Sequence, residues 1–325
     1  MDFGNILGNT AAYLFSPTTM AYALAATGLA VHFGYTGLLN FGMAAFMAVG
    51  GYGYAISVLS FGLPWWIGML IGLIAGAGFA LILGIPTLRL RADYLAIATI
   101  AAAEVVRLLF LTELFKKWTN SAGGLSGYHQ SFRDINPFPP GTYGFGPWTY
   151  NANDLWVRVF GLIMLTIAVL FVWALMRSPW GRVLKGIRED EDAVRSLGKN
   201  VFAYKMQALV VGGVLGALGG IVFVLPSAVI PGSYSTSLTF FLWTILLLGG
   251  AATVLGPTLG AVLFWVVFAF LGSLLPAMAD AGLLPMTAAQ ADMVRYILIG
   301  VVLMLIVIFR PQGILGNKRE MTFVK

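Results

Sequence analysis

The sequence predicts an all-α polytopic membrane protein, and two observations support that prediction. Of its 325 residues, 59% are hydrophobic and only 10% are charged, whereas a soluble domain is usually about 25% charged. The apolar residues also gather into runs that approach the roughly 20 residues with which a helix crosses a bilayer. Lipid offers no partner for free backbone groups, so the spanning segments must be helices. We therefore expect a single transmembrane domain over residues 1–325.

Nine apolar segments are the expected spanning helices. They cover residues 12–32, 40–59, 64–85, 92–112, 156–176, 203–226, 237–250, 255–273 and 294–309. The seventh is short and ends in two glycines, which indicates a broken or tilted helix. The junction between the first two, from Gly34 to Gly42, is rich in glycine and carries no charge. That composition favours a tight turn or an irregular segment buried within protein.

The positions of Lys and Arg predict the orientation, because cytoplasmic loops carry an excess of both. Thirteen of the 19 basic residues lie in the loop 86–91, between Arg177 and Lys205, or in the tail 310–325. We place these segments in the cytoplasm, which leaves the N-terminus outside and makes 113–155 a folded external loop. If the seventh segment only re-enters the membrane, everything after it inverts. The net charge of +6 therefore reflects topology and contact with lipid rather than a nucleic-acid partner.

Several kinds of chemistry are excluded by what the chain lacks. It has no cysteine, and hence no disulfide, thiolate metal site or cysteine nucleophile. It contains no Walker A sequence, no nucleophile elbow and no HExxH pair. No apolar segment has the density of ionisable residues that a proton relay requires. We expect no catalytic residue, metal or cofactor in this chain, and we favour a pathway moved by an external motor. A stand-alone secondary carrier or channel is the alternative from a different class, and a membrane enzyme ranks third.

Polar groups within the apolar segments are candidates for function because they are costly there. Glu104 and Arg107 lie three residues apart on one helix face, so a structural ion pair is favoured over a role in transport. His32 is expected to be a packing histidine with its hydrogen bonds satisfied. Four residues are candidate pathway groups, although polar groups at this depth more often hold helices together. They are Asn40, Thr99, Glu104 and Thr244.

The longest strongly charged run, residues 178–201, separates two membrane-length segments. It forms two short amphipathic pieces when it is interpreted as helix. The apolar faces of the two pieces hold Val183, Leu184 and Ile187, and Val194, Leu197 and Val201. Gly198 suits the position just past a helix end, where the backbone turns left-handed. From the pattern alone, a solvated connector held near lipid headgroups is favoured over a protein interface.

Six stretches in order resemble one known family. They are residues 34–53, 87–108, 122–127, 178–201, 249–260 and 309–315, which include GYTGLLNFG, TLRLRADYLA, GGAATVLGPTLG and FRPQGIL. Each motif alone is weak, but the ordered set resembles the LivM-type permeases of branched-chain amino-acid ABC importers over nearly the whole chain. The resemblance implies a multi-pass protein of a bacterial or archaeal inner membrane that forms a pathway for leucine, isoleucine and valine. Urea and short-amide importers use permeases of the same kind and are the alternative.

The resemblance also implies partners and a coupling segment. The partners would be a second, LivH-like permease, two cytosolic ATPases that bind ATP and magnesium, and an extracytoplasmic solute-binding protein. Residues 181–200 would dock into an ATPase groove as a coupling helix, with Val194 and Leu197 as its apolar anchors. The family positions that fall within this segment are Gly181, Arg188, Glu189, Asp190, Glu191, Ala193, Ser196, Leu197 and Gly198.

Overall fold

The computed structural model describes residues 3–146, 148–310 and 312–316, and most of them are helical. The helices are α1 (Phe3–Ala12), α2 (Pro17–Leu29), α3 (Met43–Phe61), α4 (Trp65–Thr87), α5 (Ala92–Leu111), α6 (Lys116–Thr119), α7 (Gln130–Arg133), α8 (Ala152–Arg177), α9 (Pro179–Glu189), α10 (Glu191–Ser196), α11 (Val201–Val224), α12 (Thr236–Gly249), α13 (Gly256–Asp280) and α14 (Ala288–Phe309). Strands β1 (Thr142–Phe145) and β2 (Trp148–Asn151) form an antiparallel hairpin. The expected all-α class is confirmed.

The expected number of spans is only partly met. Among the described residues, α3, α4, α5, α8, α11, α13 and α14 are long and apolar enough to cross a membrane. Two further helical segments, Phe3–Phe15 and Pro17–Tyr35, are long and apolar enough only when taken together, and they are bent by 43°, as in a broken span or a re-entrant loop. The prediction of residues 12–32 missed this bend, which lies where Ser16 caps α2 and Pro17 begins it. The predicted seventh span is the 14-residue α12, about 21 Å long and short of a ~30 Å hydrocarbon core.

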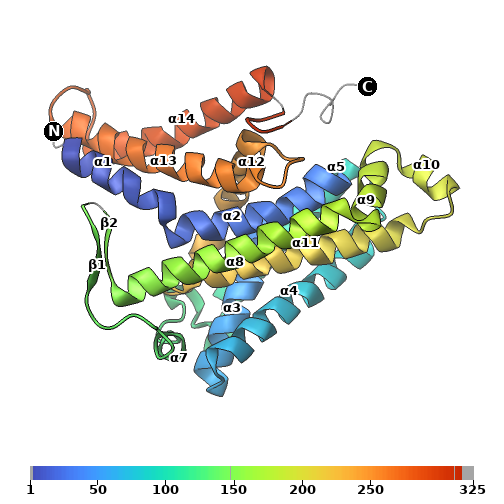
Figure 1. The fold of residues 1–325 in the computed structure, drawn as a ribbon, viewed down its shortest axis with the longest axis horizontal. Helices are drawn as coiled ribbons and strands as arrows, with labels where there is room; N and C mark the ends of the chain where they lie inside the picture. Colours follow the sequence, from blue (N-terminus) through green and yellow to red (C-terminus); the bar gives the residue numbers. More distant parts are fainter. Residues whose placement is uncertain (1–2, 147, 311, 317–325) are drawn as a thin grey trace.

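Helix α11 is the centre of the bundle and packs against α2, α3 and α4 (Figure 1). Small residues allow this close approach. A Cβ at Gly220 of α11 would lie 2.6 Å from the carbonyl carbon of Met47 in α3, and one at Gly212 would lie 2.5 Å from the carbonyl oxygen of Gly28 in α2. Only glycine lets backbones meet at such distances, and the resulting dispersion contacts replace the hydrophobic drive that lipid cannot supply.

The first two long helices are separated by an irregular buried segment, as the glycine-rich junction predicted. Helix α2 continues into the π-helical turn η2 (Ala30–Tyr35). Gly37 then takes a φ of +76°, and the chain has no regular structure until α3 begins at Met43. Leu38 and Asn40 are buried. We call residues 36–42 the helix break.

Helix α12 ends inside the protein because the chain supplies partners for its last carbonyl groups. The backbone N–H of Ile314 donates to the carbonyl of Leu248 at 2.9 Å, and that of Leu315 donates to Gly249 at 3.0 Å. A helix end leaves such carbonyls without intrahelical partners, so Ile314 and Leu315 cap α12. Of the predicted tail 310–325, residues 311 and 317–325 lie outside the described residues.

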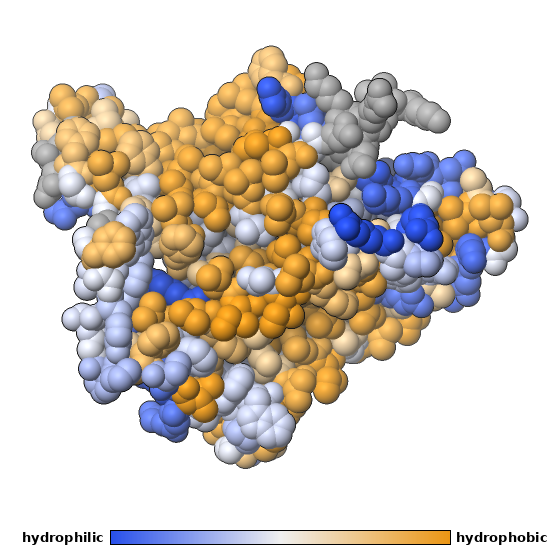
Figure 2. All heavy atoms as spheres, in the orientation of Figure 1, coloured by the Kyte–Doolittle hydropathy of each residue, from blue (hydrophilic) through white to orange (hydrophobic). Residues whose placement is uncertain are grey.

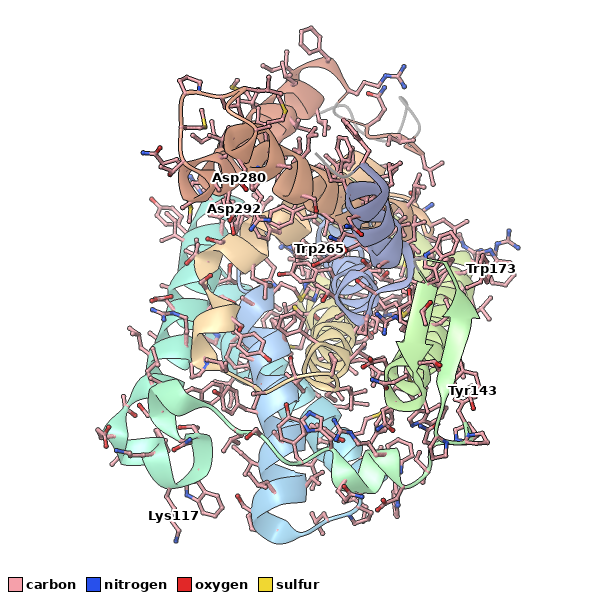
Figure 3. All side chains as sticks on the ribbon, turned by 90° about the vertical axis from the view of Figure 1, so that its left-hand side faces the viewer. Lys117, Tyr143, Trp173, Trp265, Asp280 and Asp292 are labelled. Atoms are coloured by element: carbon pink, nitrogen blue, oxygen red, sulfur yellow. The ribbon has the colours of Figure 1, made fainter. Side chains whose placement is uncertain are left out.

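The two ends of the molecule are formed by different elements, and an apolar band separates them. In Figure 1, α9 and α10 lie at one end, and the hairpin β1–β2 and the start of α1 lie at the other. Hydrophobic residues form a broad band between them in Figure 2, whereas α9 and α10 are largely hydrophilic. Figure 3 views the molecule from the hairpin end, with Trp265 of α13 near the middle. Its ring packs edge-on against Tyr22 of α2, with centroids 4.9 Å apart.

Candidate coupling site and helix break

The charged loop, residues 178–200, folds into two helices that meet at Asp190. The apolar face predicted for the first helix is confirmed, since Leu184 is fully buried, Ile187 is 4% exposed and Val183 is partly buried. Gly181 is also buried, because a Cβ there would lie 2.6 Å from the Cα of Met176. Because Gly181 has no side chain, α9 packs tightly against the end of α8 in the same chain.

Helix α10 is held by its own polar residues. The carboxylate of Asp190 caps the helix by accepting from the backbone N–H groups of Asp192 and Ala193, each at 3.0 Å. Glu191 pairs with Arg195 at 2.9 Å and also with Lys205 of α11. Caps and charged pairs of this kind each contribute up to about 1 kcal/mol at an exposed site. Together they fix the position of α10 against the start of α11.

Leu197 and Val194 do not share one face, so that prediction is wrong. Val194 is 9% exposed and packs toward Gly186 of α9, so it cannot serve as an outward anchor. Leu197 is 78% exposed. The reason is that α10 ends at Ser196 and Gly198 turns the chain with a φ of +74°. Glu189, Ala193 and Ser196 are exposed as well. The loop thus presents one apolar side chain among charged neighbours.

Arg188 points inward, toward the helix break. Its guanidinium Nη1 donates a hydrogen bond to the carbonyl oxygen of Gly34 in η2. Its stem lies beside Gly37, where a Cβ would come within 3.3 Å of the arginine Cγ. Lys185, one turn earlier in α9, lies 5.9 Å from the ring of Tyr35. A charge-assisted hydrogen bond contributes about 1.5–3 kcal/mol, so α9 is firmly attached to the segment that precedes the break.

Hydrogen bonds within the break, and others from η2 and α5, hold it in place. Asn40 Oδ1 accepts from the backbone N–H of Gly42 at 2.7 Å, and its Nδ2 lies 3.0 Å from Nδ1 of His32. The other ring nitrogen of His32 lies 3.0 Å from the carbonyl of Leu209 in α11, so His32 is the satisfied packing histidine that we expected. The hydroxyl of Thr99 in α5 accepts from the N–H of Phe41 at 3.0 Å.

Aromatic residues cover the break on the side of α12. Trp243 stacks on Phe41 with ring centroids 4.6 Å apart, and its indole N–H donates to the carbonyl of Asn40 at 3.3 Å. Phe33 meets the same indole edge-on at 4.8 Å. The break therefore contacts α5 and α12 directly, and His32 connects it to α11. Sequence reasoning missed Trp243, and nothing in its local sequence distinguishes it from other tryptophans.

The four candidate pathway residues do not form one cluster. Asn40 and Thr99 meet at the break, as described above. Thr244 is buried in α12, and its hydroxyl donates to the carbonyl of Phe240 at 2.8 Å. Glu104 accepts from Nε of Arg107 at 2.9 Å within α5, which is the predicted intrahelical pair. That carboxylate side chain is 40% exposed at the surface of the bundle.

We find no cluster of metal-ligating side chains in the described part of the chain. No group of three or more His, Asp or Glu side chains there is arranged to hold a metal ion. The interior groups are hydroxyls, amides and aromatic rings, and the charged groups lie mainly at the two ends. Hydroxyls and amides of this kind join helices through hydrogen bonds, as Asn40 and Thr99 do at the helix break.

Comparison with known protein families identifies the class of this protein. A family model described as the permease component of branched-chain amino acid transport systems matches residues 13–307. The chain belongs to this family. Its members are membrane permease components of transport systems and not enzymes. The helix break, the charged loop and the cap of α12 are therefore features of a permease.

Individual relatives agree with the family. The LivM protein of Salmonella typhimurium, named as a high-affinity branched-chain amino acid transport permease, is 30% identical over 94% of this chain and 70% of its own length. The probable LivM protein of Methanocaldococcus jannaschii is 28% identical over 93% of this chain and 92% of its own length. The nucleoside permease NupC of Lactococcus lactis is 26% identical over 62% of each chain.

Proposed function

We propose that this permease is the membrane subunit of an ABC importer that carries leucine, isoleucine and valine. The observation that carries the proposal is the similarity to proteins of that named activity over at least 93% of the chain, in a bacterium and in an archaeon. The matched nucleoside permease covers less of the chain. Urea and short amides are the alternative cargo, since permeases of this kind serve such importers too.

Uptake by the reconstituted importer tests the cargo. The permease is assembled in proteoliposomes with its ATPases, its second permease and its solute-binding protein. We expect ATP-dependent uptake of radiolabelled leucine that unlabelled isoleucine and valine suppress and urea does not. Suppression by urea alone would move the assignment to the amide importers. Leucine uptake by the purified chain alone, without ATP, would instead favour a stand-alone carrier.

The charged loop is the proposed docking element for an ATPase that binds ATP and magnesium. Leu197, 78% exposed, suits an apolar anchor that enters a groove, and its charged neighbours suit a rim that orients the contact. Burial of a leucine side chain contributes roughly 1.5–3 kcal/mol. Leu197→Asp should therefore weaken ATPase binding by about tenfold or more without unfolding the permease.

A matched control exists at the opposite end of the molecule. Leu114 is 82% exposed and follows α5 in the short turn η3 (Glu113–Phe115). Leu114→Asp introduces the same charge at an equally exposed leucine. In a pull-down of the tagged permease in mild detergent, we expect the Leu114 variant to retain the ATPases and the Leu197 variant to lose them. Equal recovery with both variants would contradict docking at Leu197.

Arg188 and the helix break form the proposed route by which the ATPases act on the pathway. The guanidinium joins α9 to Gly34, and the break that follows contacts α5 through Thr99 and α12 through Trp243. An irregular segment at membrane depth is tolerated where it is buried or lines a cavity. We infer that the break lines the pathway. The polar groups of the pathway would be Asn40 of the break, Thr99 of α5 and Thr244 of α12.

The face of α5 that carries Glu104 is the proposed contact with the second, LivH-like permease. Glu104 lies seven residues before the end of α5, about 10 Å below it at 1.5 Å per residue. Its carboxylate is 40% exposed, and a charged pair facing hydrocarbon there would be costly. Glu104→Leu should weaken recovery of the second permease in the same pull-down, whereas Ile74→Leu, at an exposed site on α4, should not.

The proposed orientation places the charged loop in the cytoplasm and the hairpin end outside, where the solute-binding protein would dock. The chain has no native cysteine, so single cysteines report exposure cleanly. In intact cells an impermeant thiol reagent should label a cysteine that replaces Gln130 and spare one that replaces Asp190. The reverse pattern would overturn the orientation.

A further inference from the structure

A large hollow lies beside the charged loop, between the α4–α5 connection and the start of α11. Its volume is about 890 Å³, which is large enough for a ligand. Five basic residues line it. They are Arg89, Arg91, Arg195, Lys199 and Lys205. We call these residues the basic hollow. Arg89 and Arg91 both lie in the stretch 87–108. Neither of them has a role in the proposed transport route.

The basic hollow has an excess of positive charge. Glu191 and Asp192 also line it, but both carboxylates are taken up by Arg195 and Lys205. Within the described residues, Arg89, Arg91 and Lys199 have no ion pair, and all three are exposed. Five cations against two anions leave a net charge of +3. Clustered like charges of this kind repel one another, so an anion with several oxygen acceptors would relieve the cluster.

The membrane side of the basic hollow is apolar. The guanidinium of Arg89 lies over the ring of Phe202, 5.8 Å from its centroid. Helix α4 leads from the hollow into the hydrophobic band and exposes a stripe of aliphatic side chains. Among them Ile74 is 69% exposed, Ile82 is 72% exposed and Ile85 is 57% exposed. A ligand that fits both parts has an anionic head and an aliphatic body.

We propose that the basic hollow binds the phosphate headgroup of an anionic phospholipid, with its acyl chains lying along α4. Arg89, Arg91 and Lys199 would donate to the phosphate oxygens. The membrane surface favours this ligand, since anionic lipids gather near basic residues at the ends of spanning helices. Bound lipid would then brace the α4–α5 connection against α10. Lipid binding here does not depend on which solute the pathway carries.

Native mass spectrometry of the purified full-length permease tests the proposal. The protein is titrated with phosphatidylglycerol and, separately, with phosphatidylcholine of the same chains. We expect one tightly held phosphatidylglycerol and no comparable phosphatidylcholine. The double variant Arg89→Gln/Arg91→Gln should bind phosphatidylglycerol roughly 30-fold more weakly. The control Arg177→Gln/Arg182→Gln removes two exposed arginines from the same end, outside the hollow, and should bind as the native chain does.

Each other outcome would overturn the proposal. Equal phosphatidylglycerol binding by both double variants would show that the hollow is not the lipid site. Displacement of the lipid by an excess of inorganic phosphate would show that the hollow takes a free phosphate group. Unchanged lipid binding with loss of the co-purified ATPases would assign Arg89 and Arg91 to a protein contact. If the double variant does not fold, the single variant Arg89→Gln, at an exposed position outside the docking loop, takes its place with the same expectations for the loss of one charge instead of two.

Discussion

Replacing Gly34 by alanine tests whether the turn before the helix break is held rigidly between its neighbours. A Cβ at Gly34 would overlap the carbonyl oxygen of Ala251 and lie 2.6 Å from its carbonyl carbon. Carbon atoms in contact need roughly 3.5 Å, so η2 and the turn after α12 would have to separate by about 1 Å. Both contacting groups are backbone and cannot rotate away. Overpacking of this kind costs about 1–3 kcal/mol.

Thermal unfolding in detergent, followed by tryptophan fluorescence, measures that cost. At roughly 2–4 °C per kcal/mol for a large domain, Gly34→Ala should lower Tm by about 2–12 °C. The control is Gly78→Ala in α4, where a Cβ would meet no atom within 4 Å. A helical glycine replaced by alanine gains up to about 1 kcal/mol, so Tm should stay or rise. Equal Tm values for the two variants would refute the close packing at Gly34.

Three further changes probe other contacts. Arg188→Gln removes the charge-assisted hydrogen bond to η2, which contributes about 1.5–3 kcal/mol. Uptake by the reconstituted importer should therefore fall at least about tenfold while the ATPases still bind. Normal uptake would contradict the proposed route. Burial lowers the pKa of His129 in the folded protein. The stability that the neutral imidazole contributes is therefore present above the ordinary histidine pKa of about 6.5, and it is lost as pH falls below that value. His129→Gln should therefore reduce the drop in Tm between about pH 7.5 and pH 5, and an unchanged drop would count against this. Gly313 has a φ of +73° and would overlap the carbonyl oxygen of Leu247 if it gained a Cβ. Gly313→Ala should therefore cost about 1–3 kcal/mol of stability and lower Tm by about 2–12 °C; a native Tm would mean that the cap of α12 is not tight.

The sequence predicted those parts of the fold that depend on local pattern. Apolar runs of sufficient length identified α3, α4, α5, α8, α11, α13 and α14, because lipid makes span length a strong signal. Gly198 marked the end of α10 because few other residues adopt its backbone conformation. The pair Glu104–Arg107 followed from helical spacing alone. Each of these features is decided by residues within a few positions of one another.

The features that the sequence did not predict depend on distant contacts. The two glycines correctly marked the end of the 14-residue α12, but no local signal shows that residues some 65 positions later cap that end. Val194 turns inward because α9 folds back to meet it, although its spacing matches that of Leu197. The inward direction of Arg188 is likewise set by Gly34, which lies 154 positions away. A charge pattern shows that an arginine is present but not which carbonyl it reaches.

These contacts explain why a charged surface loop suits the transmission of force. A loop that bent freely would absorb any push from a docked ATPase before it reached the membrane. This loop is stiffened at three places: Leu184 anchors α9 in the core, Asp190 caps α10, and Glu191 ties α10 to Lys205 of α11. Movement of the exposed Leu197 would therefore carry α9 with it. Because Arg188 holds the carbonyl of Gly34, that movement would act first on η2, the turn that precedes the helix break.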